Sequence, residues 1–178
     1  MPPHPLGFET KENSLATRPI LPYPHASLSQ ICAPVTAFDD HLRELVTDLI
    51  DTMRAAPGVG ITAAHIGVLQ RVFVLELTPG TVLTYINPEI ISRSTQAMRH
   101  VEGSVSMPGF TDEVERPSMV EIRFQDITGA EHAETAEGFH AICIQHEIDQ
   151  LDGIFWLKRL SRLKRDRLVK KWEKSQKP

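Results

Sequence analysis

The pattern of apolar positions is clearest after residue 35, where it has the period of a helix. The apolar side chains lie three or four positions apart, as on the buried face of an amphipathic helix: Leu42, Leu45, Val46, Leu49, Ile50 and Met53. Thr36 and Asp39 resemble a capping box before this stretch, and Pro57-Gly58 follows it. We therefore predict a helix between these two signals, with its apolar stripe in the core.

Shorter apolar runs in the middle of the chain have the character of strands. Residues 72–77, 81–86 and 119–124 are rich in β-branched residues or alternate between apolar and polar positions. Pro79-Gly80 and Thr128-Gly129 supply turn signals beside them. This pattern predicts antiparallel hairpins.

Two further helices are predicted in the C-terminal part of the chain. Residues 139–151 form one, and residues 161–176 form another, with its basic residues outward and three apolar residues inward: Leu163, Leu168 and Trp172. Helices interleaved with antiparallel hairpins indicate an α+β fold. Residues 1–17 lack periodicity and are expected to be a flexible arm, so we predict one domain over residues 18–178.

Charge is distributed unevenly along the chain. The net charge is −4, but residues 158–178 hold ten of the 19 lysines and arginines and only two of the 23 acids, a local net charge of +8. The rest of the chain therefore carries −12. No apolar run approaches the roughly 18 residues of a membrane helix, and we find no secretory or transit signal. We expect a cytoplasmic protein with reduced Cys32 and Cys143, and neither DNA nor a membrane as a partner.

The main candidate for chemistry is the run His146-Glu147-Ile148-Asp149-Gln150. It matches the zinc-hydrolase motif H-E-x-x-H except that glutamine replaces the last histidine. In the intact motif the two histidines share one helix face and bind the metal, while the glutamate acts on a bound water. One ligand and the base are retained here.

Three segments together resemble the motifs of the peptide deformylases. Family motifs are roughly G-x-G-[L/I]-A-A-x-Q-x-G, E-G-C-L-S and Q-H-E-x-D-H-L-x-G. This chain has, in the same order, GVGITAAHIG at residues 58–67, EGSVS at residues 102–106 and QHEIDQLDG at residues 145–153. The resemblance implies a single α+β domain in which antiparallel β-sheets surround the motif-bearing helix, with a further helix at the C-terminus.

The resemblance also implies a metal-dependent reaction. The family holds Fe²⁺, often replaced by Zn²⁺ or Ni²⁺, with the cysteine of the second motif and both histidines of the third. Those positions are Ser104, His146 and Gln150 here. The metal-bound water removes the formyl group from an N-formyl-methionyl peptide, with the glutamate, Glu147 here, as base.

Further roles follow from the same resemblance. The oxyanion is met by the side chain at the position of His65 and by the backbone N–H of Val105. The peptide pairs with the first motif as an added strand and its methionine enters an apolar pocket. The residues expected to line this groove are Gly58, Val59, Gly60 and Gly103.

Three residues that differ from the motifs lie at positions expected to bind the metal or the oxyanion. Ser104 and Gln150 offer neutral oxygen or amide donors where the family has a thiolate and an imidazole, so metal binding is predicted to be weak or absent. His65 has two interpretations. It supplies a new ligand or a base for Ser104, or it fills the volume of the glutamine and hydrogen-bonds its neighbours.

Three functions therefore stay open. The first is a deformylase-like protein with weak or absent hydrolase activity that binds formyl-methionyl or related peptide N-termini. The second is an active amidohydrolase with a site rebuilt around His65, Ser104, His146 and Glu147. The third is a ribosome-associated pseudoenzyme that acts through the basic helix, because the corresponding helix of some bacterial deformylases docks on the ribosome: Lys164, Arg165, Arg167, Lys170, Lys171 and Lys174.

Overall fold

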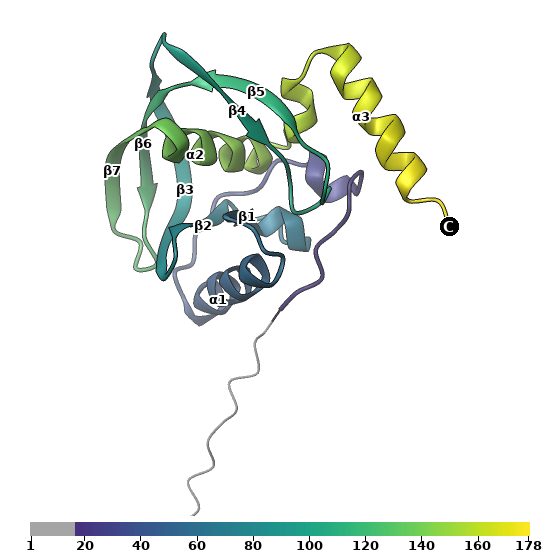
Figure 1. The fold of residues 1–178 in the computed structure, drawn as a ribbon. Helices are drawn as coiled ribbons and strands as arrows, with labels where there is room; N and C mark the ends of the chain where they lie inside the picture. Colours follow the sequence, from purple (N-terminus) through teal and green to yellow (C-terminus); the bar gives the residue numbers. More distant parts are fainter. Residues whose placement is uncertain (1–16) are drawn as a thin grey trace, which may run out of the picture.

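The computed structural model describes residues 17–178 and contains helices packed against antiparallel sheets (Figure 1). The predicted flexible arm, residues 1–17, lies outside the described residues except for its last residue. The helices are α1 (Asp40–Ala55), α2 (Gly138–Leu151) and α3 (Arg162–Ser175), with short 3-10 turns η1 (Ala26–Ser29), η2 (Ala63–Ile66) and η3 (Trp156–Arg159). The predicted α+β class is confirmed.

Five strands form the main sheet, in the order β1-β2-β3-β6-β7, and every neighbouring pair is antiparallel. Their bounds are β1 Gly60–Thr62, β2 Val72–Thr78, β3 Thr81–Arg93, β6 Met119–Gln125 and β7 Glu131–Glu137. A separate two-stranded ribbon pairs β4 (Ala97–Glu102) with β5 (Asp112–Pro117). Strand β1 is short and lies at one edge of the main sheet, so its outer side has no strand partner among residues 17–178.

The two faces of β2 are buried against different helices. Val72 and Val74 belong to a cluster with the apolar stripe of α1, whereas Phe73 and Leu75 belong to a cluster with α2. Alternate side chains of a strand point to opposite faces, so burial on both faces explains the continuous apolar run of β2. Helix α2 lies between the main sheet and the β4–β5 ribbon (Figure 1).

A third apolar cluster holds the C-terminal helix in place. Leu168 and Trp172 of α3 pack with η3 residues, and the Trp172 indole donates a hydrogen bond to the Tyr23 carbonyl. The prediction that Leu163 faces inward is wrong, because this side chain is 70% exposed. It lies five and nine positions before Leu168 and Trp172, which at about 100° per residue places it on the opposite face of α3.

Other local predictions also need correction. Asp39, not Thr36, caps α1, and its side chain accepts the backbone N–H of Leu42. The strand predicted at residues 81–86 continues to Arg93, and β1, β4, β5 and β7 were not predicted. No helix within residues 17–178 is long and apolar enough to span a bilayer.

Candidate functional site

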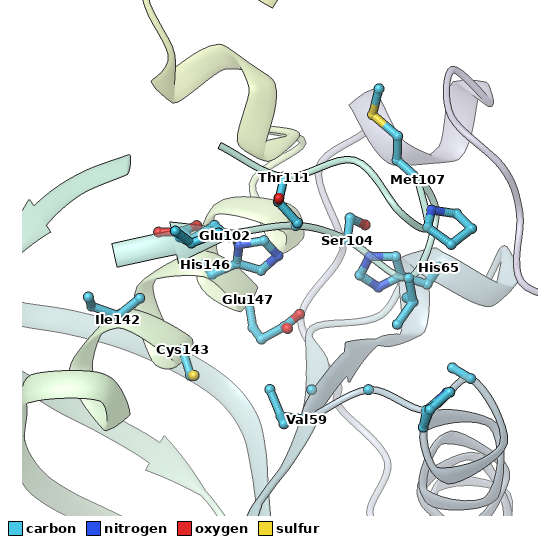
Figure 2. Close-up of a pocket in the computed structure, with 18 of the residues that line it drawn as sticks. Val59, His65, Glu102, Ser104, Met107, Thr111, Ile142, Cys143, His146 and Glu147 are labelled. Carbon is cyan, nitrogen blue, oxygen red and sulfur yellow. Dashed lines mark hydrogen bonds and ion pairs between the residues drawn. The ribbon is translucent and has the colours of Figure 1, made fainter. Parts of the chain in front are cut away.

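A cavity of about 520 Å³ lies where the three motif segments meet. The segments that line it are the β1–η2 region, the loop after β4, and α2 as far as Glu147 (Figure 2). Nine of the ten residues singled out from the sequence line this cavity: Gly58, Val59, Gly60, His65, Gly103, Ser104, Val105, His146 and Glu147. The tenth, Gln150, does not.

Glycine at residues 58 and 60 leaves room for the side chains that line the cavity. A Cβ atom on Gly60 would lie 2.6 Å from Glu147 Oε1 and 2.7 Å from Leu75 Cδ2. A Cβ atom on Gly58 would lie 2.9 Å from Val105 Cγ1. The first motif therefore has its glycines where its backbone runs against the motif helix and against the loop after β4.

A buried ionic network fixes His146. Arg116 of β5 donates to both carboxylate oxygens of Glu102, at 2.6 and 2.9 Å. Burial opposes ionisation of Glu102, but hydrogen bonds from His146 and Arg116 outweigh it and lower its pKa to about 2. Because an ionised carboxylate only accepts, His146 Nδ1 carries the proton in the 2.7 Å bond to Glu102 Oε1. The other nitrogen, Nε2, is left for the cavity.

The same network shifts the pKa of His146 and reaches further along α2. Burial lowers the pKa of His146, but its hydrogen bond to Glu102 and the charge of Glu147 more than compensate, so the net shift is upward. Arg116 also donates to Asp149, at 2.8 Å, and Arg159 pairs with the same carboxylate. Asp149 is therefore an anchor for the motif helix rather than a member of the cavity.

Glu147 is a buried carboxylate at the cavity. Its side chain is 5% exposed, and Oε2 has no hydrogen-bond partner among the described residues. Burial raises its pKa to about 7, with the charge of Glu102 adding to the rise and those of His146 and Arg116 opposing it. An acid with this pKa is poised to exchange a proton near neutral pH.

His65 is the second buried group with a free polar atom at the cavity. Its Nδ1 lies 3.0 Å from the backbone nitrogen of Thr62 and 2.9 Å from Thr62 Oγ1, while Nε2 has no partner among residues 17–178. Burial, with the nearby charge of His146, lowers the pKa of His65 to about 3, so the ring is neutral. Thr62 was not singled out from the sequence, although it stands where the first motif has alanine.

The expected metal ligands do not form a coordination site. The Gln150 amide is 3% exposed and donates to the Leu28 carbonyl at 2.8 Å, which turns it away from the cavity. Ser104 Oγ accepts the backbone N–H of Ser106 at 3.1 Å and offers a neutral hydroxyl. No cluster of three or more histidine, cysteine or carboxylate side chains suited to a metal occurs within residues 17–178. A neutral hydroxyl and one imidazole do not fit a tightly held Fe²⁺ or Zn²⁺.

The remainder of the cavity wall is largely apolar. Val59, Leu75, Ile142 and Cys143 line it, and the rings of His100 and Phe139 pack at its rim with centroids 4.9 Å apart. Burial raises the pKa of the Cys143 thiol to about 12, helped by Glu147, so this cysteine is a neutral wall residue. No sequence signal marks His100 and Phe139, which come together from β4 and α2.

His146 and Glu147 lie together on a buried helix at the cavity, within an antiparallel α+β fold. This arrangement is typical of the H-E-x-x-H hydrolases, except that the last histidine of the motif is replaced here. A family model for polypeptide deformylases matches residues 17–166. The chain belongs to the polypeptide deformylase family.

Relatives and solved structures agree with this assignment. A peptide deformylase-like protein of Agrobacterium fabrum is 90% identical over 164 residues, covering 92% of this chain and 100% of that protein. A peptide deformylase of Phenylobacterium zucineum is 43% identical, covering 90% and 97%. The crystal structure of the Ehrlichia chaffeensis peptide deformylase in complex with actinonin is similar with a TM-score of 0.86 and 34% identity, covering 91% and 99%.

Proposed function

We propose that this protein binds formyl-methionyl or related peptide N-termini and that its formyl-hydrolase activity is weak or absent. The observation that carries the proposal is that the cavity is retained, whereas the residues at the three metal-ligand positions of the family do not come together in it. The cavity keeps its glycine floor, apolar wall and buried Glu147, whereas Gln150 is bonded to the Leu28 carbonyl outside it. Peptide contacts can therefore persist where metal chemistry does not.

Strand β1 is the expected docking edge for the peptide backbone. Within residues 17–178 it pairs only with β2, so an extended peptide can add to its other side as a further strand. The side chain of the first residue of the peptide would then face the apolar wall formed by Val59, Phe139 and Ile142. A volume of about 520 Å³ is in the usual range for a small-ligand pocket and accommodates one such side chain with its N-terminal group.

The rebuilt amidohydrolase is the weaker alternative. It needs His65 to take a proton from Ser104 or to bind a metal, and both roles require a lone pair on the ring nitrogen that faces the cavity. Backbone N–H groups only donate, so the bond from Thr62 assigns the lone pair of His65 to Nδ1. The proton then resides on Nε2, which leaves His65 a donor.

The test is a calorimetric titration of formyl-Met-Ala-Ser into protein purified without chelator and supplied with Fe²⁺, with formate measured in the same solution. Saturable binding without formate release is the expected result. Formate release at a steady rate would overturn the loss of activity. Heat indistinguishable from dilution, in protein shown to be folded, would overturn peptide binding.

We also propose that α3 contacts the ribosome and that the protein acts in the cytoplasm, where formylated chains emerge. The support is an exposed basic surface on a helix held to the body by Leu168 and Trp172: Arg162, Lys164, Arg167, Lys170, Lys171 and Lys174. Co-sedimentation with ribosomes should weaken steeply between about 50 and 200 mM salt. It should also disappear when Lys170, Lys171 and Lys174 are changed to glutamate. Binding that survives both changes would exclude α3 as the contact.

A further inference from the structure

A second cavity, of about 450 Å³, lies beside the C-terminal end of α3, and we call it the α3 cavity. Its walls come from the segment before η1, from the loop after β4 and from the last turn of α3. His65, His146 and Glu147 line only the cavity of about 520 Å³, here called the peptide cavity. The α3 cavity is therefore separate from the residues expected to carry the chemistry.

The wall of the α3 cavity is uncharged and has flat apolar surfaces. The rings of Phe110 and Trp172 meet edge to face, with centroids 5.4 Å apart and planes at 87°, and Pro22 and Pro108 add two further rings. The Trp172 indole N–H already donates to the Tyr23 carbonyl at 2.9 Å, so the indole offers its apolar ring. No described residue of this wall carries a charge, so the wall favours a neutral ring compound over an ion, which would lose hydration without gaining a partner.

One buried side-chain oxygen belongs to this wall, the hydroxyl of Ser106. Ser106 is 1% exposed, and its hydroxyl has no hydrogen-bond partner among residues 17–178. The Ser106 backbone is held on both sides, because its N–H donates to Ser104 Oγ at 3.1 Å and its carbonyl accepts the Tyr23 N–H at 2.8 Å. Buried hydroxyls without a partner are rare, and a ligand that supplies one can offset the desolvation cost. A ligand of the α3 cavity is therefore expected to have one group that bonds a hydroxyl.

The α3 cavity and the peptide cavity share part of their walls. Four residues line both of them: Ile20, Val105, Pro108 and Phe110. Ser106 lines only the α3 cavity, and Ser104, two residues earlier in the same loop, lines only the peptide cavity. A ligand in one cavity therefore contacts side chains that a ligand in the other must also accommodate.

We propose that the α3 cavity is a regulatory site for a neutral, ring-containing compound with one hydroxyl or ring N–H, and that its occupation weakens peptide binding through the shared wall. The ring packs against Phe110 and Trp172, and the polar group bonds the Ser106 hydroxyl. A volume of about 450 Å³ is within the usual range for small-ligand sites. The regulation rests on the proposed function, whereas ligand binding in the α3 cavity does not.

The first test uses 2-naphthol, a bicyclic ring with one hydroxyl that is neutral near neutral pH. In proton–nitrogen correlation spectra it should shift the indole N–H signal of Trp172 saturably, with a Kd below about 1 mM. Trp156, which lines neither cavity, is the internal control, and Trp172→Phe assigns the two signals. Naphthalene-2-sulfonate, the same ring with a charge, should bind at least about tenfold more weakly. No saturable shift of Trp172, or equal affinity for the sulfonate, would overturn the site.

Variants separate the α3 cavity from the peptide cavity. Ser106→Ala should weaken 2-naphthol binding about fivefold because it removes one hydrogen bond, whereas the matched control Ser29→Ala, at an exposed position, should change nothing. Phe139→Ala opens the wall of the peptide cavity alone, so it should leave the affinity for 2-naphthol unchanged. Unchanged affinity in Ser106→Ala, or a loss in Phe139→Ala, would overturn the assignment. The Trp172 shift is measured in the unaltered protein, so it decides the question even where a variant fails to fold.

A calorimetric titration of formyl-Met-Ala-Ser at rising concentrations of 2-naphthol measures the regulation. The peptide Kd should rise about fivefold and then level off as the α3 cavity fills, and a bound peptide should weaken 2-naphthol by the same factor. A peptide Kd that keeps rising would mean direct competition in the peptide cavity, and a constant Kd would mean that the two cavities are independent; either result would overturn the regulation. Peptide that does not bind at all would overturn the proposed function and the regulation together, while the Trp172 shift alone decides whether the α3 cavity is a ligand site.

Discussion

The burial of Glu147 makes a quantitative prediction about stability. In an unfolded chain a glutamate has a pKa of about 4.5, and burial raises that of Glu147 to about 7. The folded state therefore holds this proton over a range of pH in which the unfolded state has released it. Stability from this group is fully present below about pH 4.5 and is lost as the pH rises to about 7.

The size of the effect follows from the pKa difference. Each pKa unit corresponds to about 1.4 kcal/mol, so a shift from 4.5 to about 7 represents about 3 kcal/mol between pH 4 and pH 8. Glu147→Gln removes the titration. The free energy of unfolding of this variant, minus that of the unaltered protein, should therefore rise by about 3 kcal/mol over this range. Any cost of burying the glutamine amide is independent of pH and drops out of the change.

The assay is urea unfolding followed by the fluorescence of Trp156 and Trp172, in chelator, at five or more pH values between 4 and 8. Glu44→Gln, at an exposed position of α1, supplies the baseline for losing a solvated carboxylate. A Glu147→Gln difference that stays constant with pH would refute the reasoning, because it would mean that the Glu147 carboxylate titrates as it does in water.

Three further predictions follow from the same contacts. Ser104→Cys with Gln150→His should restore stoichiometric metal and some formate release, measured by elemental analysis and a formate assay; a folded, metal-loaded but inactive double variant would mean that the oxyanion site has also diverged. Gly60→Ala should weaken formyl-peptide binding at least about tenfold in calorimetry, because its Cβ would lie 2.6 Å from Glu147 Oε1; unchanged affinity would exclude this edge of the cavity. Arg116→Met should reduce the free energy of unfolding by about 3 kcal/mol or more, since it leaves two buried carboxylates short of a partner; a loss below about 1 kcal/mol would show that their other partners suffice.

The sequence predicted the elements whose burial follows a simple period. The apolar stripe of α1 and the buried run of β2 fall at helical and strand spacing, so both could be located without the structure. The strands that were missed lack this signal. Strand β7 reads EHAETAE and lies at the free edge of the sheet, where solvent covers most of its residues. The alternation of apolar and polar residues cannot predict a strand that is stabilised mainly by pairing with its neighbour.

The sequence predicted which residues line the cavity, but not the hydrogen bonds that these residues make. The three motifs located nine of the residues that line the cavity. The backbone of the fold brings the three motif segments together, even where individual side chains within them are replaced. The place of Gln150 could not be foreseen, since its partner Leu28 is 122 residues away in the chain. The contact between Thr62 and His65 could have been found, since the two residues are three apart in one motif and both depart from it.

We propose that the fold retains the peptide cavity without the metal chemistry. The most direct test is the metal content of protein purified anaerobically, without an affinity tag or chelator, and then dialysed against Fe²⁺. The Ser104→Cys, Gln150→His variant prepared in parallel provides the positive control. We expect far less than one equivalent of metal in the unaltered protein and about one in the variant. Near-stoichiometric metal in the unaltered protein would contradict this proposal, because other groups must then replace the two lost ligands.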